Sequence, residues 1–482
     1  MQGHSSERTY ITSWSAAKYL SYAFWRAWFL VMYSSPVWLS FVVPEGVNPG
    51  LQMYYLSTVC FVAASVILSV LHAKTVELFS LKGAMVAFGA GASAGVVMEF
   101  AALMLWHDPG SWLFWLGSGL TGICTAPIAI RAGQIYASVR VNTAVIGTLL
   151  SDVAAGLIFF FCIGTWPIVC LFIAAALPLL SAVMIVITTP SGDGGAVDIG
   201  TATAGALSRK SFLRFLVVVF LIGAVAFLQN GLGNSWFSQA SLDSGLTLGV
   251  SLLVMVSFAL AVFFAIVQKV QFETLYRPII FCLIAFVAVA YLLDFGNPVA
   301  IGGTFLVYCL FSSYIWVFMS YLGHSRYFSP VQVFGYGRSA YAGGSLLGCL
   351  LGVYVLPQVD LVRALPVIVV VMIGILLLCA VAIRQVDISS ILVQDAAEKR
   401  SDSHPAKADA AAAPVEADQL GDVHLSPREL EVFALMRAGR DSEYIANSLC
   451  VSRNTAKTHI RNIYAKFGVH RRQDFIDVIQ KL

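Results

Sequence analysis

The sequence predicts an all-α protein with two parts: a polytopic membrane helix bundle of six plus six helices, and a C-terminal four-helix domain containing a helix-turn-helix. Of its 482 residues, 59% are hydrophobic and only 11% are charged, whereas soluble domains carry about 25% charged residues. The long apolar runs end near residue 386. Residues 423–482 instead hold 10 Lys and Arg against 6 Asp and Glu. A basic, water-soluble domain therefore follows the membrane part.

Twelve apolar runs are long enough to cross a bilayer, which needs about 20 mostly apolar residues per helix. They begin near positions 19, 50, 83, 111, 141, 164, 211, 246, 277, 297, 335 and 362. Residues 1–18 precede them as an N-terminal segment. The longest connection, residues 191–210, separates a first membrane half, residues 19–190, from a second half, residues 211–386.

The charges of the loops predict the orientation of the helices. One set of alternating loops is basic and holds Arg8, Lys18, Lys74, Lys82, Arg131, Arg140, Arg209, Lys210, Lys269, Arg277, Arg326 and Arg384. The opposite loops hold Glu45, Asp108, Asp243, Asp294 and Asp360, with Arg363 as the one basic exception. Lys and Arg mark cytoplasmic loops. We therefore expect a multi-pass protein of the bacterial inner (cytoplasmic) membrane, with both termini in the cytoplasm.

The arrangement of two six-helix halves around a central loop resembles the major facilitator superfamily. The resemblance rests on the number of spans and the position of the loop, and it implies a facilitator-like membrane domain. That superfamily usually places a turn rich in Gly, Asp and Arg between its second and third helices. Here the same position reads "HAKTVELFSLKG", which argues against active transport.

Residues 387–422 are predicted to be a flexible cytoplasmic linker. Within them, residues 394–422 are rich in Ala and Asp, lack apolar periodicity and hold 3 basic against 7 acidic residues, a composition typical of disordered segments. The alternative is that the last membrane helix continues through this segment. Pro405 and Pro414 argue against a continuous helix because proline breaks the helical hydrogen-bond pattern.

The last sixty residues predict a helix-turn-helix. Ser426, Pro427 and Glu429 form a capping box with proline at the first helical position. A second helix is expected from about Ser442, and Ser452 is expected to cap a third. Helical spacing predicts that these side chains face the core: Leu430, Val432, Phe433, Met436, Ile445, Ala446, Leu449, Ala456, Ile460, Ile463 and Phe467.

The opposite face of the third helix carries Asn454, Lys457, Thr458 and Arg461. Such a polar, basic face fits the major groove of DNA, and the helix N-terminus favours phosphate groups. The alternative is an ordinary solvated surface.

Sequence motifs favour the DNA-binding interpretation. The motifs "LSPRE.EV", "IA..L", "VS..T.KTH...IY.K" and "GV..R" occur in order. Residues 423–482 thereby resemble the LuxR-type (GerE-type) DNA-binding domain along their whole length. This family commonly has valine where Ala456 stands, and a Ser-Asn-Lys-Glu-like stretch where "DSEY" stands. Both differences preserve the essential chemistry, because Ala456 is small and apolar and Ser442 can cap a helix.

The resemblance assigns roles to individual residues. Glu429 corresponds to an acid that supports the scaffold, and Ile445 and Ala446 to the packed core. The residues implied to contact DNA are Arg453, Asn454, Thr455, Lys457, Thr458, His459 and Arg461. Residues 472–482 correspond to the usual dimer surface of the family, so a homodimer is expected on double-stranded DNA.

Four ionisable residues fall within the predicted spans: Arg26, Glu99, Asp152 and Arg338. Charged groups inside a membrane are costly and often functional. Arg26 and Asp152 are expected to pair, either as a structural lock or as part of a ligand site. Arg338 is expected to extend towards the cytoplasmic membrane surface.

A facilitator-like cavity would be lined by the first, fourth, seventh and tenth spans. The candidate ligand-binding residues are Trp25, Arg26, Trp28, Tyr33, Glu99, Asp152, Gln229, Asn230, Tyr308, Ser312, Ser313, Tyr314 and Trp316. Aromatic walls with a few amides and hydroxyls suit a small, partly aromatic molecule. The alternative for each Trp and Tyr is a place in an interfacial belt.

Three functions fit this pattern. The first is a membrane-bound one-component transcription regulator, whose membrane domain senses a small-molecule inducer and controls DNA binding. The second is a small-molecule transporter with a regulatory DNA-binding tail, and the third is a structural anchor with a constitutive tail. The sequence has no phosphate loop, no HExxH and no metal-ligand spacing, so we expect neither an enzyme nor a metal or cofactor.

Overall fold

The computed structural model describes residues 19–34, 49–139, 141–188, 209–236, 239–267, 276–293, 296–324, 328–382, 425–437 and 453–469, together with Ile445, Leu449 and Phe475. It divides the chain into two compact units, Met1–Ile391 and Leu392–Leu482. The predicted N-terminal segment 1–18 and the linker 387–422 lie outside the described residues, as does nearly all of the central loop 191–210.

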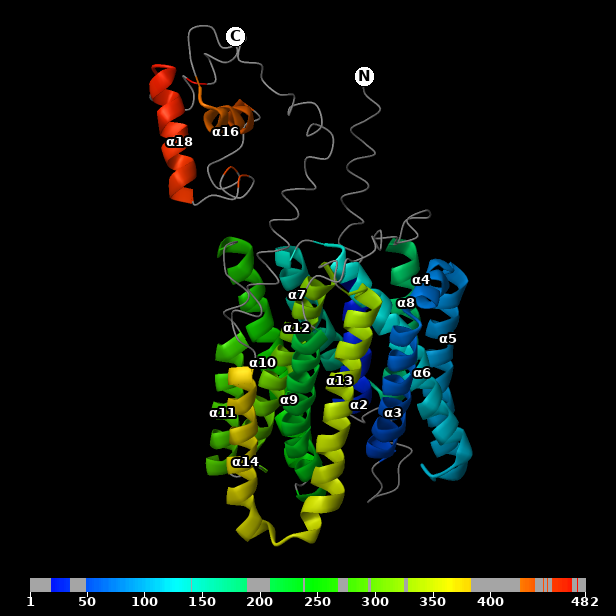
Figure 1. Cartoon of the computed structure of the whole chain (residues 1–482). Coiled ribbons are helices and arrows are strands. Elements are labelled where there is room, and N and C mark those ends of the chain that lie inside the picture. Colours follow the sequence, from blue (N-terminus) through cyan, green and yellow to red (C-terminus); the bar gives the residue numbers. More distant parts are fainter. Residues whose placement is uncertain are drawn as a thin grey trace. The chain divides into compact units, whose positions relative to one another are not determined.

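The described residues of the first membrane half form six long helices and one short one (Figure 1). The long helices are α2 (Leu20–Ser34), α3 (Pro49–Val70), α5 (Lys82–Trp106), α6 (Trp112–Ala137), α7 (Val141–Ile163) and α8 (Pro167–Thr188). The short helix α4 (His72–Ser80) lies where the sequence analysis expected a loop. The Thr75 hydroxyl donates to the Leu68 carbonyl at 2.8 Å and so joins α4 to the end of α3.

The second membrane half repeats the pattern of six long helices. They are α9 (Arg209–Trp236), α10 (Gln239–Val267), α11 (Tyr276–Leu293), α12 (Pro298–His324), α13 (Pro330–Leu350) and α14 (Leu361–Ala382). A π-helical turn, Leu351–Val355, and a 3₁₀ turn, Leu356–Gln358, join the last two. The six-plus-six bundle predicted from the sequence is confirmed. The largest displacement is in α10, expected from position 246 and found from Gln239.

Close packing between α9 and α13 organises the second half. A Cβ atom added to Gly344 would collide with the carbonyl oxygen of Phe220, and one added to Gly348 with that of Ala224. The two helix backbones therefore touch directly, as small residues four apart allow inside membranes. The two halves meet where α3, α6 and α7 contact α10, α12 and α13.

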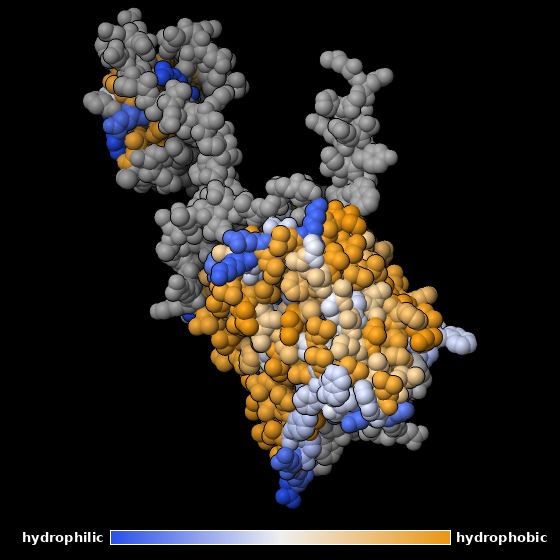
Figure 2. Space-filling view, turned by 90° about the vertical axis from the view of Figure 1, so that its right-hand side faces the viewer, coloured by the Kyte–Doolittle hydropathy of each residue, from blue (hydrophilic) through white to orange (hydrophobic). Residues whose placement is uncertain are grey.

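The first unit has a surface suited to lipid. Large apolar side chains such as Phe172, Ile266 and Val370 are exposed, and hydrophobic residues dominate the described face in Figure 2. Within the described ranges, nine helices are long and apolar enough to span a membrane, and Phe212–Leu228 and Pro278–Leu293 are shorter apolar helices. The protein is thus a multi-pass membrane protein.

The second unit is built on α16 (Pro427–Arg437) and α18 (Arg453–Lys466). Its core contains Val432, Phe433, Ile445, Ile463, Val469 and Phe475. The predicted capping box is confirmed: the Ser426 N–H donates to Glu429 Oε2 at 2.8 Å, and the Glu429 N–H donates to Ser426 Oγ at 3.3 Å. Most of the predicted second helix and of segment 472–482 lies outside the described residues.

Candidate functional site

Arg26 of α2 and Asp152 of α7 form a buried ion pair, as the sequence analysis predicted. Arg26 Nε donates to Asp152 Oδ1 at 3.1 Å, and the two side chains are 2% and 0% exposed. The hydroxyl of Ser313 on α12 donates to the other carboxylate oxygen. Asp152 therefore neutralises Arg26 and also ties the first membrane half to the second.

An aromatic cluster lies beside this pair. The Tyr22 ring stacks on Trp316, with 4.1 Å between ring centroids, and Trp25 stacks on Trp316 at 6.1 Å. Tyr136 of α6 meets both Tyr22 and Trp316 edge-on. Trp316 is fully buried, so this cluster belongs to the interior of the bundle and not to an interfacial belt.

Arg338 does not extend to the membrane surface, contrary to expectation. It is only 4% exposed, and its guanidinium carbon lies 4.9 Å from the Trp25 ring centroid and 5.3 Å from that of Tyr341. Arg338 lies deeper than expected because α13 begins at Pro330, five residues before the predicted start at residue 335. Arg338 is therefore two turns inside the helix, where α13 packs against α3 and α9.

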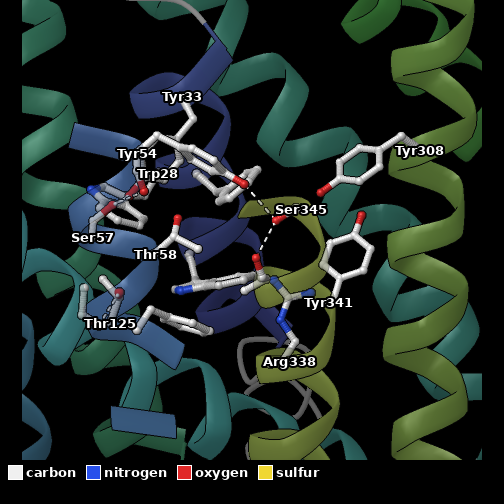
Figure 3. Close-up of a pocket in the computed structure, with 15 residues that line it drawn as sticks. Trp28, Tyr33, Tyr54, Ser57, Thr58, Thr125, Tyr308, Arg338, Tyr341 and Ser345 are labelled. Atoms are coloured by element: carbon white, nitrogen blue, oxygen red, sulfur yellow. Dashed lines mark hydrogen bonds between the residues drawn. The ribbon is translucent and has the colours of Figure 1, made fainter. Parts of the chain in front are cut away.

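A cavity of about 40 Å³ opens beside Arg338 between the two halves (Figure 3). Its walls come from α2, α3 and α6 of the first half and from α12 and α13 of the second. The lining residues are Trp25, Trp28, Phe29, Tyr33, Tyr54, Ser57, Thr58, Phe61, Gly122, Thr125, Tyr308, Arg338, Tyr341, Ala342 and Ser345. The cavity is thus mainly aromatic, with several hydroxyl groups and one cation.

Hydrogen bonds fix the walls of this cavity. Tyr33 Oη and Ser57 Oγ lie 2.7 Å apart. The Tyr54 hydroxyl donates to Ser345 Oγ at 2.7 Å, which joins α3 of the first half to α13 of the second (Figure 3). Because this bond crosses between the halves, the width of the cavity depends on their separation.

The structure places the candidate ligand residues in three groups. Trp25, Trp28, Tyr33 and Tyr308 line the cavity. The following are buried outside its lining: Arg26, Glu99, Asp152, Ser312, Ser313, Tyr314 and Trp316. Glu99 lies on α5, where it packs against Gly117 of α6. The side chains of Gln229 and Asn230 lie outside the described residues.

The contributions of α3 and α13 to the cavity were not predicted from the sequence. Tyr54, Ser57 and Thr58 on α3 face the cavity, and so do Tyr341 and Ser345 on α13. One signal was available: Tyr54, Ser57, Thr58 and Phe61 recur at helical spacing within a mostly apolar run.

The candidate DNA-binding residues all lie on α18. Thr455, Thr458 and Arg461 are exposed, and His459 is half-buried. The side chains of Arg453, Asn454 and Lys457 lie outside the described residues, although their backbone is part of the helix. Ile463 is buried in the core, and Ile460 and Phe467 pack against it, as predicted. This inward stripe directs the opposite face of α18 outward.

Comparison with known families identifies this second unit. The family of bacterial regulatory proteins of the LuxR type, also called GerE, matches residues 423–479. Residues 423–479 are a LuxR-type DNA-binding domain. The helix-turn-helix domain expected at the C-terminus is confirmed by this match, and the structure describes its helices α16 and α18.

Solved structures are similar to the membrane unit. The human organic anion transporter MFSD10 matches with a TM-score of 0.53 and 13% identity, over 78% of this chain and 99% of that chain. A bacterial homologue of the iron transporter ferroportin matches with a TM-score of 0.53 and 13% identity, over 77% of this chain and 98% of that chain. The Major Facilitator Superfamily transporter FucP in its outward conformation matches with a TM-score of 0.50 and 13% identity, over 79% of this chain and 99% of that chain. The membrane unit therefore has a major facilitator fold.

Glu429 joins the two described helices of the LuxR-type domain. Its Oε2 accepts a hydrogen bond from Lys466 Nζ of α18 at 2.7 Å. This bond, together with the one from the Ser426 N–H, lowers the pKa of Glu429 to about 2. Glu429 is thus the scaffold acid that the family resemblance implied.

The lowered pKa of Glu429 predicts a loss of stability in acid. An unfolded glutamate has a pKa of about 4.3, so Glu429 contributes stability above that pH, and this contribution is lost as the pH falls towards 2. Because Lys466 is 39% exposed, we expect a screened contribution of about 1–2 kcal/mol. Thermal unfolding of residues 392–482 at pH 7 and pH 3 measures it.

Glu429→Gln should be destabilised at pH 7 and should lose less stability than wild type between pH 7 and pH 3. Glu431→Gln is the matched control, because Glu431 pairs with Arg428 on the surface, where the two side chains are 49% and 44% exposed. Equal acid sensitivity of wild type and Glu429→Gln would contradict the assignment.

Proposed function

We propose that this protein is a membrane-bound one-component transcription regulator. A small molecule binds in the facilitator-like unit and changes the binding of the LuxR-type domain to double-stranded DNA. The observation that carries this proposal is the aromatic cavity between the two membrane halves, in the same chain as a DNA-binding domain. Residues 387–422, which lie between the membrane unit and the LuxR-type domain in the sequence, contain no receiver domain. The signal therefore comes from the membrane unit or the linker.

The physical basis is a shift between two states. A ligand shifts an equilibrium only by the difference between its affinities for the two states. Because both halves line the cavity and the Tyr54 to Ser345 bond crosses between them, a ligand in the cavity favours one separation of the halves over another. This difference in affinity is the source of regulation.

The remaining assignments belong to the same proposal. The basic loops support a location of the membrane unit in the bacterial inner membrane, with both termini in the cytoplasm. On DNA, two LuxR-type domains pair on symmetric half-sites. The proposed DNA contacts are Arg453, Asn454, Thr455, Lys457, Thr458, His459 and Arg461.

A reporter fused to the promoter nearest the gene tests the proposal. We expect full-length protein to change reporter output with one class of compound from a panel of small aromatic molecules, charged and neutral. Residues 415–482 alone should give output that does not depend on the compound. Equal, compound-independent output from both proteins would overturn the sensor function. Accumulation of the active compound in vesicles containing the protein would instead indicate a transporter with a regulatory tail.

A further inference from the structure

The cavity presents several hydrogen-bond donors that lack acceptors. Arg338 Nε and Nη1, Trp25 Nε1 and Trp28 Nε1 are all buried, and none has an acceptor within the part of the chain that the structure describes. All three residues line the cavity. Guanidinium and indole N–H groups can only donate, so no rearrangement among these three side chains can satisfy them. Leaving buried donors unpaired is costly.

The charge of Arg338 is also unbalanced. Four Asp, Glu, Lys or Arg side chains are buried in the described residues of the membrane unit: Arg26, Glu99, Asp152 and Arg338. Both carboxylate oxygens of Asp152 are already engaged, by Arg26 and Ser313. Glu99 packs against α6, and no salt bridge joins Arg338 to an acidic residue anywhere in the described ranges. The Trp25 and Tyr341 rings attract the cation through their faces, but ring faces do not supply a counter-charge.

We propose that the cavity binds a small organic anion with an aromatic body, and that the Arg338 guanidinium binds its carboxylate. This inference rests on the proposed sensor function and names the class of its ligand. A carboxylate supplies both missing features: a negative charge, and two oxygens that accept paired hydrogen bonds from the planar guanidinium. Phe29, Phe61 and Tyr54 provide apolar walls for the rest of the molecule.

The size of the cavity adds a consequence for regulation. About 40 Å³ accommodates a group the size of a carboxylate, which needs little more room than a few water molecules. An attached aromatic ring needs additional space. The ring gains this space when α3 and α13 separate, so the ligand favours the more open arrangement of the two halves.

Binding to purified full-length protein in lipid nanodiscs tests the inference. The probes are benzoate, phenylacetate and 3-phenylpropanoate, each compared by calorimetry with its primary amide, which is neutral and nearly the same shape. We expect at least one carboxylate to bind about tenfold or more tightly than its amide, because charge-assisted hydrogen bonds are the stronger ones. Arg338→Gln should abolish this preference, and Arg338→Lys should retain part of it.

Arg363→Gln provides the matched control. It removes the same charge from a side chain that is 89% exposed and pairs with Asp360, and it should leave the preference unchanged. The comparison between carboxylate and amide in the wild-type protein does not depend on the folding of any variant. Equal binding of each acid and its amide to wild type, or no binding of any acid at millimolar concentration, would overturn the inference.

The reporter separates this inference from the sensor function. Induction by neutral compounds that persists in Arg338→Gln would overturn the anion site and leave the sensor function standing. Output that no compound changes would remove the sensor function, whereas a preference for carboxylates in the nanodisc assay would still support the anion site.

Discussion

Replacing Asp152 with asparagine should destabilise the membrane unit by about 3–5 kcal/mol, because it leaves a buried cation without its partner. Arg26 and Asp152 are almost completely inaccessible to solvent, so water cannot solvate the Arg26 cation once the Asp152 charge is removed. Asparagine has nearly the volume of aspartate, which separates the electrostatic effect from a packing effect. Unfolding of the purified full-length protein in mixed micelles by increasing dodecyl sulfate measures the change.

Two further variants distinguish the ion pair from its surroundings. Ser313→Ala removes one hydrogen bond but keeps the pair, and should cost only about 1 kcal/mol. Arg26→Met combined with Asp152→Leu removes both charges and should recover most of the stability lost in Asp152→Asn, since apolar replacements of buried pairs are often neutral. A normal unfolding midpoint for Asp152→Asn would leave Asp152 without a structural role.

Replacing Lys457 with alanine should abolish reporter output while the protein still enters the membrane. Lys457 lies on α18 and is one of the proposed DNA contacts, and each lost base contact costs about 1–3 kcal/mol. In a dimer the loss occurs twice. Reporter output and an immunoblot of the membrane fraction measure the two properties separately.

Arg437→Ala is the control for this prediction. Arg437 is exposed in the last turn of α16, so its replacement removes one positive charge from another surface of the same domain. We expect output close to that of wild type. Unchanged output from Lys457→Ala would remove Lys457 from the DNA-binding surface, and equal losses in both variants would point to a general effect of charge.

The long membrane helices could be predicted because their signal is length and apolar composition, which lipid imposes directly. The Arg26 to Asp152 pair could be predicted for a related reason: a charge inside a membrane needs a partner. The core of the LuxR-type domain could be predicted from helical periodicity, because a helix exposed to water has a polar outer face and an apolar inner face. Its capping box could be predicted from Ser426 and Glu429.

The walls of the cavity could not be predicted with the same success. Lipid and the protein interior are both apolar, so composition does not show which face of a membrane helix points inward. The contributions of Tyr54 and Ser345 were therefore missed. The environment of Arg338 was also misjudged, because an error of a few residues in the start of α13 moved it from a helix end to the interior.

The direct backbone contact between α9 and α13 has a mechanical consequence. With glycines at 344 and 348, no side chains separate the two helices that could repack to absorb a displacement. We therefore expect α9 to move together with α13 when α13 is displaced. Helix α14 also packs on α9, and it is the last described helix before the LuxR-type domain. We therefore expect a displacement of α13 beside the cavity to reach α14 through α9.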